Sequence, residues 1–290
     1  MNQNKVLYMF PRSQTNNSKL GGYDEEWDDM YDMGDTSWKV RRSAVQLTDT
    51  LILTHPELLL MLAETLFDKL VKRFTEQEQN VKLDVFSTLS DFLKAIVYGE
   101  SSIEAEENLE ELLGKPTLNR LKPSFAVLNN KLTAMIASLV KVFADKKITA
   151  ALKAAASGLL LRATQCTPDT ILNHLDSIIK LIEINFSQSS NSTELRSNML
   201  QTLRAILKIQ IIQSKPQIES HYARIYKLIQ LAIEDQNFKV SSEGYKALTV
   251  FYKALRPNLS LPASNFSVYI KPVIPTVVKT LKETDIDEEV

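Results

Sequence analysis

The sequence predicts an all-α protein, a right-handed solenoid (α-α superhelix) of about five stacked helical hairpins with a truncated sixth. One reason is that degenerate copies of the segment around Trp38 and Val40 return along the chain at the spacing of a helical repeat. A second is that apolar residues in each copy recur with the period of a helix. A third is that the chain has only seven glycines, which argues against a hairpin-rich β architecture.

The copies can be aligned on one apolar residue, here called the anchor, near the start of the second helix of each hairpin. The anchors are Val40, Val81, Ile148, Leu195, Val240 and Val290. The intervals between them are 41, 67, 47, 45 and 50 residues. Three intervals fit the roughly 40 to 47 residues of HEAT and armadillo repeats, and the other two fit one repeat plus an inserted loop. The spacing therefore predicts HEAT-type repeats.

Residues at fixed distances from each anchor extend the pattern. Four positions after the anchors stand Ala44, Val85, Leu152, Met199 and Gly244, of which the glycine is the weakest match. Eleven positions after them stand Leu51, Phe92, Leu159, Ile206 and Phe251. Because an anchor and these two positions lie along one stripe of an α-helix, each anchor is expected to open a helix with one buried face. We expect the second set to form one continuous dry seam.

The helices can be placed in chain order. The first is expected over residues 37–54, with Asp35 or Ser37 as its N-cap and its end before Pro56. Short polar turns then make the helices of each pair antiparallel neighbours. The expected pairs are 56–74 with 81–97, 125–143 with 147–163, 168–186 with 193–211, and 217–234 with 238–255. Residues 266–282 form one more first helix and the chain stops on an anchor, so both ends look like cuts within a longer array spanning 37–290.

Two segments precede the repeats. Residues 1–22 are polar and match no repeat, so we expect a disordered leader. Residues 23–36 are acidic without a compensating base and form either a solvated acidic loop or a segment that docks on a basic protein partner, with a tryptophan as apolar anchor. The candidate partner-binding residues are Asp24, Glu25, Trp27, Asp28 and Asp29. The regular ligand spacing and central glycine of an EF-hand loop are missing, so no calcium site is predicted.

The longest interval between anchors contains an inserted acidic loop at residues 98–122. Its glutamates cluster in residues 104–111, and its apolar positions are few. It can be a plain surface loop between repeats or an added recognition element, because long loops accept binding groups without disturbing a scaffold.

Composition favours an intracellular protein. The net charge of −1 indicates no nucleic-acid partner, and the longest apolar run, residues 58–63, is far too short for a membrane span. Pro11 interrupts the apolar residues 6–10 before they could serve as a secretory signal. The single Cys166 suits a reducing compartment and is expected to be an inert thiol. We expect a cytoplasmic or nuclear location, although the base-rich, acid-free first twenty residues leave a transit peptide open.

The sequence contains no recognisable catalytic, metal-binding or cofactor-binding constellation, so we expect a non-enzymatic protein with no cofactor and no small-molecule substrate. His55, His174 and His221 fall in different repeats, without Cys or His at metal-ligand spacing. Arg41 and Arg42 follow the first anchor. We expect them to pair with acids or carbonyls of the adjoining repeat rather than to form a basic patch.

The segment 35–42, Asp-Thr-Ser-Trp-Lys-Val-Arg-Arg, preceded by the Tyr- and Asp-rich stretch from Tyr23, resembles an inner segment of the cullin-associated and neddylation-dissociated protein family. Three further stretches agree, at residues 78–86, 238–257 and 269–290. Between residues 99 and 186 the likeness is only that of a helical repeat. Members of this family are long HEAT-repeat solenoids.

The resemblance implies a non-enzymatic scaffold that wraps around cullins lacking the ubiquitin-like modifier. Such a scaffold competes with substrate-adaptor modules and promotes exchange of substrate receptors on cullin–RING ubiquitin ligases, including assembly of the SCF complex. The implied partners are a cullin and its RING subunit, and this chain would hold only part of that surface. The alternative is a fragment of a HEAT-repeat nuclear transport receptor or phosphatase scaffold, which would need neither the acidic stretch nor the Trp38 segment. An unrecognised helical enzyme is the third possibility.

Overall fold

The computed structural model describes residues 36–98, 123–145, 147–187, 192–213, 216–256 and 267–282. These residues form helices and turns, and none of them lies in a β-strand. The chain divides into two units, Met1–Ser37 and Trp38–Val290. The expected leader at 1–22, nearly all of the acidic loop at 23–36 and all of the inserted loop at 98–122 except Tyr98 lie outside the described residues. Tyr98, expected in that loop, is instead the last residue of a helix. The helical repeats lie in the second unit.

The second helix of each hairpin is continuous. These helices are α1 Ser37–Thr54, α4 Gln79–Tyr98, α7 Ala150–Cys166, α10 Thr193–Gln213 and α13 Phe238–Leu255. The bounds of α1 and α13 are those predicted from the sequence, and those of the other three differ by a few residues. Thr149 caps α7 by accepting a hydrogen bond from the Leu152 N–H at 3.4 Å, and Asn237 caps α13 by accepting one from the Lys239 N–H at 3.1 Å.

The first helices are interrupted, except for α6 Pro123–Ala144. The pieces are η2 Pro56–Leu58, α2 Leu59–Thr65, α3 Phe67–Lys72 and η3 Arg73–Thr75; then α8 Pro168–Leu172 and α9 Leu175–Phe186; then α11 Pro216–Glu219 and α12 Tyr222–Ile233; and last α14 Ser267–Ile270 and α15 Ile274–Thr280. The expectation of single helices over 56–74, 168–186, 217–234 and 266–282 was therefore wrong.

The interruptions have a common cause at two of these places. At each place a short turn that begins with a proline ends in a hydrogen bond between residues three apart. The N–H of His174 donates to the Ile171 carbonyl at 2.9 Å, and the N–H of His221 donates to the Ile218 carbonyl at 3.0 Å. Such i→i−3 bonds belong to the 3₁₀ geometry, which redirects the chain before the next helix begins. The apolar stripe continues through the bend, so periodicity alone does not reveal it.

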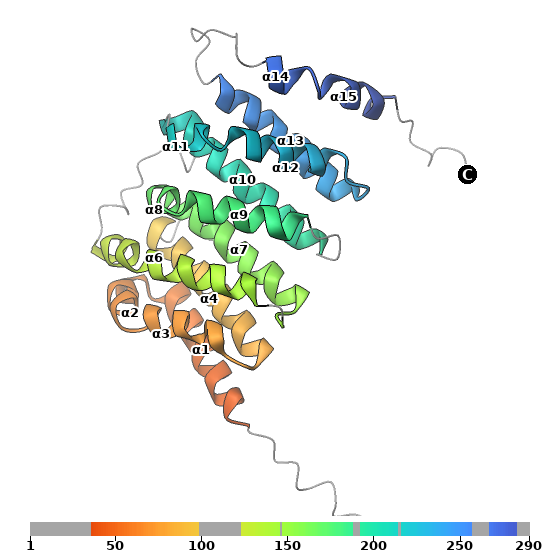
Figure 1. The fold of residues 1–290 in the computed structure, drawn as a ribbon. Helices are drawn as coiled ribbons and strands as arrows, with labels where there is room; N and C mark the ends of the chain where they lie inside the picture. Colours follow the sequence, from red (N-terminus) through yellow and green to blue (C-terminus); the bar gives the residue numbers. More distant parts are fainter. Residues whose placement is uncertain are drawn as a thin grey trace, which may run out of the picture. The chain divides into compact units, whose positions relative to one another are not determined.

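The helices stack in two layers, and successive labels can be followed along the stack in Figure 1. In one layer α4 packs on α7, α7 on α10, and α10 on α13; in the other α2 and α3 pack on α6, α6 on α9, and α9 on α12. The helices of the inner repeats thus contact both their hairpin partners and the equivalent helices of the next repeat, as in an α-solenoid. The predicted all-α helical-repeat fold is confirmed, while its handedness and exact repeat number stay predictions.

The predicted seam lies in the core. Phe92, Leu159, Ile206 and Phe251 are at most 1% exposed, and Leu51 is partly buried against the same cluster. The anchors divide, however: Val81, Leu195 and Val240 are fully buried, Ile148 is half-buried, and Val40 is 73% exposed. The prediction of a buried anchor was wrong for α1. Among the described helices, the layer of second helices continues on only one side of α1, at α4, so the opposite side of α1 is not covered.

One described helix, α6, is long and apolar enough to cross a membrane by length and composition alone. The core helices of soluble proteins meet the same criterion, so this observation by itself is weak support for a membrane span. In this fold Leu128, Leu132 and Met135 of α6 are buried in the common core.

Candidate interaction surface

The five residues that the sequence singles out for partner binding, Asp24, Glu25, Trp27, Asp28 and Asp29, lie outside the described residues. Their role stays a prediction. The described residues contain no group of three or more His, Cys, Asp or Glu side chains that could hold a metal ion. Cys166 is fully buried at the end of α7, and His55 on the surface contacts Glu57 at 2.9 Å.

Ion pairs connect successive repeats at equivalent positions. Arg41, one residue after its anchor, donates from Nε to Glu76 Oε2 at 2.9 Å and from Nη2 to Oε1 at 3.1 Å. Arg196, one residue after its own anchor, pairs with Asp235. Each acid stands five residues before the next anchor. The repeat therefore has one fixed place for a base and one for the acid that binds it, here called the junction pair.

Arg42 adds a second bond between α1 and α4, from Nε to Asp84 Oδ2 at 2.8 Å. The prediction that Arg41 and Arg42 pair with acids of the neighbouring repeat is therefore confirmed. Burial raises the pKa of the Glu76 carboxyl, but hydrogen bonds from Arg41 and from two backbone N–H groups outweigh it and hold that pKa below the ordinary value of 4.5. Glu76 is consequently charged at neutral pH and fixes α1 against the turn before α4.

Another pair of equivalent positions joins neighbouring second helices nearer their middles. One member stands nine residues after the anchor of its own helix, and the other stands three residues after the anchor of the next helix. In α10 and α13 it holds Arg204 and Glu243, with Nη1 and Oε2 2.6 Å apart. In α7 and α10 it holds Ser157 and Asn198, whose Nδ2 donates to Oγ at 3.0 Å. These bonds fix the register of neighbouring helices.

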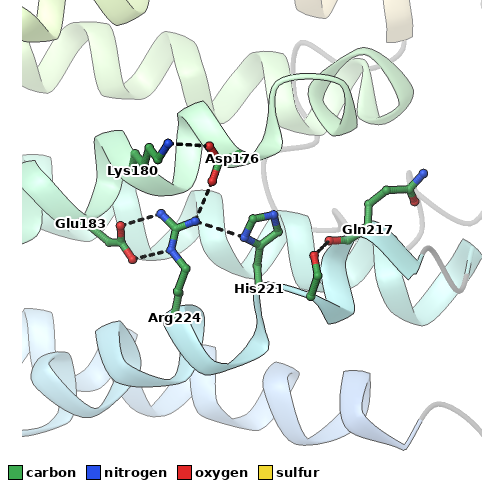
Figure 2. A network of polar contacts seen from close by, with 7 residues as sticks. Asp176, Lys180, Glu183, Gln217, His221 and Arg224 are labelled. Carbon is green, nitrogen blue, oxygen red and sulfur yellow. Dashed lines mark hydrogen bonds and ion pairs between the residues drawn. The ribbon is translucent and has the colours of Figure 1, made fainter.

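The other layer carries a denser network around Arg224 of α12 (Figure 2). Its guanidinium donates to both carboxylate oxygens of Glu183 on α9, at 2.8 and 2.6 Å, and to Asp176 Oδ1 at 2.7 Å. Asp176 also accepts from Lys180 at 2.9 Å. Hydrogen bonds from Arg224 lower the pKa of Glu183, and bonds from Lys180 and Arg224 lower that of Asp176. A bidentate pair of this kind is strong and geometrically specific.

His221 completes this network as a neutral group. Burial and then the adjacent Arg224 lower the pKa of its imidazole, and its Nδ1 lies 3.3 Å from Arg224 Nη1, where a neutral ring can accept the hydrogen bond. Together these contacts clamp α9 to α12. The charged groups of the cluster are matched with one another, so the network joins two successive repeats.

Several large apolar side chains that stand in solvent lie on the first and last described helices and at the start of α13. Val40 and Leu47 are exposed on α1, while Val268 on α14 and Leu281 after α15 are 70% and 80% exposed. Phe238, at the first position of α13, is 75% exposed. Exposed aromatic and apolar side chains are groups through which one protein can contact another. Phe238 was missed in the sequence because it stands only two residues before an anchor and looks like part of the buried stripe.

The fold and these contacts define a class of protein: a helical-repeat scaffold whose described polar groups connect repeats and whose exposed apolar groups can contact other proteins. Comparison with known proteins shows which proteins this chain resembles. Residues 169–290 match the protein-family model described as CAND1-like, TPR repeats. The anchors are more widely spaced than the roughly 34 residues of a typical TPR unit and lie closer to HEAT spacing.

Three similar proteins bear the name Cullin-associated NEDD8-dissociated protein 1. That of Arabidopsis thaliana is 23% identical over 88% of this chain and 20% of its own length. The Dictyostelium discoideum protein is 27% identical over 89% and 19%, and the Drosophila melanogaster protein is 25% identical over 92% and 20%. The resemblance predicted from the sequence is confirmed, as a likeness of most of this chain to about one fifth of those relatives' length.

Proposed function

We propose that this chain is a segment of a non-enzymatic scaffold that associates with cullin–RING ubiquitin ligases whose cullin lacks the ubiquitin-like modifier, and that regulates exchange of their substrate receptors. The observation that carries the proposal is the likeness to proteins named as cullin-associated along 88–92% of the chain. The chain covers only about one fifth of those relatives. The proposed role is therefore one part of a larger binding surface, on the cullin and its RING subunit.

The contact residues that we propose are the acidic stretch with its tryptophan, Asp24, Glu25, Trp27, Asp28 and Asp29. Carboxylates suit a basic surface on the partner, and a tryptophan supplies the large apolar anchor on which protein interfaces commonly depend. We also propose that the protein is located in the cytoplasm, the nucleus or both, because it would encounter the proposed ligase partners there. A fluorescent fusion confined to another organelle would contradict that location.

The test is co-purification of the full chain with a reconstituted cullin–RING complex, unmodified or carrying the modifier. A transport GTPase and a phosphatase catalytic subunit serve as controls for other helical-repeat functions. We expect retention on the unmodified complex alone. Equal retention on both cullin forms, or retention on either control instead, would contradict the proposal.

A pair of variants assigns the contact. Replacing Asp24, Glu25, Asp28 and Asp29 by their amides, with Trp27→Ala, is expected to weaken retention at least about tenfold. The matched control replaces four glutamates of the inserted loop, Glu104, Glu106, Glu107 and Glu110, by glutamine. It removes the same charge and should retain the complex. If the first variant binds as well as the control, the acidic stretch is a solvated loop.

A further inference from the structure

A pocket with a volume of about 560 Å³ opens between two successive repeats, where α3 and η3, α4, and the end of α6 meet. Its walls carry three lysines, Lys72, Lys82 and Lys141, and its apolar floor includes Phe74 and Val142, which are both buried. The volume lies within the range of ligand-binding sites in proteins, roughly 300–1,000 Å³. Its lining residues take no part in the junction pairs or in the network around Arg224.

The pocket lies at a junction that departs from the repeat rule. Lys82 stands one residue after its anchor, the place that Arg41 and Arg196 occupy in their repeats. The matching acid would stand five residues before the next anchor, but Phe143 occupies that position. This junction has the base but lacks the acid that pairs with it at the Arg41 and Arg196 junctions. Lys82 lines the pocket instead of joining two repeats.

The positive charge of the pocket is only partly balanced by the described side chains around it. Within the part of the chain that the structure describes, none of Lys72, Lys82 and Lys141 has an ion pair. Asp145 is the single acidic residue in the lining, and its Oδ1 already accepts a hydrogen bond from the Lys147 N–H at 2.9 Å. Three cations thus face one carboxylate over an apolar floor.

We propose that this lysine pocket binds an acidic peptide segment of a partner protein, with one apolar side chain seated between carboxylates. Charge complementarity selects the occupant, because carboxylates would supply the acid missing from the junction and would be steered toward the three lysines. The apolar side chain would cover the floor at Phe74 and Val142 and exclude water from the ion pairs. The three lysines come from separate helices, α3, α4 and α6, so carboxylates spaced along a peptide can each meet one.

This proposal rests on the pocket alone and does not require a cullin as partner. The probe is a synthetic decapeptide of aspartate and glutamate around one leucine, titrated into the full chain by isothermal titration calorimetry at about 50 and about 200 mM salt. We expect one-site binding that weakens with salt and no binding of the same peptide with lysines in place of the acids. Replacing the leucine of the peptide by glycine should weaken binding, and unchanged affinity would overturn the role of the apolar floor.

Two pairs of variants locate the site. The triple variant Lys72→Glu, Lys82→Glu, Lys141→Glu is expected to bind the peptide at least about tenfold more weakly. The triple control Lys227→Glu, Lys239→Glu, Lys253→Glu makes the same change in charge at exposed residues of α12 and α13. It should stay within about twofold of the wild type. Equal losses in both would mean general attraction to a basic surface, and no loss in the first would exclude the pocket.

Thr75→Glu tests the charge without removing a lysine, since Thr75 is exposed and lines the pocket. The added carboxylate should compete with the peptide, whereas Thr249→Glu on the exposed face of α13 should not.

Circular dichroism checks that every variant keeps its helices. Full displacement of the peptide by about 10 mM phosphate would reduce the pocket to a general anion site. A dimer seen in sedimentation and lost in the lysine variant would make a second copy of the chain the occupant. Either outcome overturns the proposal.

Discussion

Helices α1 and α13 share one sequence pattern, but the structure uses it differently in each. Val240 of α13 is fully buried, and the equivalent Val40 of α1 is 73% exposed. Eleven residues further on, Phe251 is fully buried, while Leu51 is only partly buried. A pattern of apolar residues therefore marks the face that a helix can bury. Whether that face is buried depends on the neighbours that pack against it.

The two helices are also attached by different forces. Helix α13 packs on α10 and α12, and Phe251 lies in an aromatic cluster whose ring centroids are 5.4 to 5.6 Å away at Tyr222, Tyr226 and Tyr269. Helix α1 has few buried side chains and is bound by hydrogen bonds from Arg41, Arg42 and Gln46 to acids at or beside α4. Apolar burial is favourable in proportion to area, whereas partly exposed ion pairs are screened and weaker.

The largest expected effect is at the centre of the aromatic cluster. Phe251→Ala removes a fully buried ring and should lower the free energy of unfolding by about 3–5 kcal/mol. The equivalent Leu51→Ala in α1 should cost only about 1 kcal/mol, because Leu51 is already partly exposed. Urea denaturation followed by circular dichroism measures both. Equal losses would show that the two helices are buried alike.

Gly244, four residues after the anchor of α13, stands where α1 has an exposed alanine. A Cβ there would lie 2.9 Å from the Ala232 side chain and 3.0 Å from the backbone of Ala232 and Ile233 in α12. Gly244→Ala must therefore separate α12 from α13, and we expect a loss of about 1–3 kcal/mol.

A second helical glycine is the control for that experiment. At Gly158 the nearest atom to a new Cβ is Asn198 Nδ2 at 3.9 Å, so Gly158→Ala should gain up to about 1 kcal/mol from helix propensity. The same urea experiment measures both variants. Stabilisation by both alanines would mean that the close approach at Gly244 is absent in solution.

The anchors themselves provide a direct comparison. Val240→Ala removes two buried methyl groups and should cost about 1.5 kcal/mol, whereas Val40→Ala should change stability by less than about 0.5 kcal/mol. Thermal unfolding at matched concentration is sufficient to rank them. A larger loss at Val40 would show that a further segment covers α1 in solution.

The smallest expected effect concerns the polar attachment of α1 and depends on pH. Glu76→Gln should cost about 1 kcal/mol at pH 7, because Arg41 loses its charged partner. The pKa of Glu76 is lower in the folded chain than its ordinary value of 4.5. Its contribution is therefore fully present above about pH 4.5 and is lost as the pH falls through the folded-state pKa.

Urea midpoints of the wild type and of Glu76→Gln should accordingly converge in acid. Glu64→Gln, at an exposed position in α2, is the control and should shift stability by less than about 0.5 kcal/mol at either pH. A gap between wild type and Glu76→Gln that persists at pH 3 would show that the carboxylate charge is not what attaches α1.

The sequence was sufficient to predict the second helices, and α13 shows why. Its start is marked by Asn237, which caps it, its interior by a stripe ending in Phe251, and its end by Arg256-Pro257. The bends in the first helices were missed. At His174 and His221 the chain turns without losing its apolar period, so the bend depends on local 3₁₀ hydrogen bonds that periodicity does not record.

The polar contacts were predicted only in part. Arg41 and Arg42 were expected to pair across repeats because they follow an anchor, and they do. The clamp of Arg224 on Glu183 and the gathering of lysines in the pocket come from residues far apart in the sequence, so only the stacked repeats bring them together. The sequence did contain a signal for the pocket, since Phe143 occupies the position at which the repeats of Glu76 and Asp235 carry an acid.

The aromatic residues are distributed in a way that has an optical consequence. Trp38 lies in α1, whereas five of the nine tyrosines lie in α12 to α15, at Tyr222, Tyr226, Tyr245, Tyr252 and Tyr269. In a chain with Trp27 replaced by phenylalanine, indole emission would report on α1 alone, and near-ultraviolet tyrosine absorbance would report mainly on the helices around α13. Because each repeat touches only its neighbours, the two signals need not change together, and their separation would measure how far cooperativity extends along the stack.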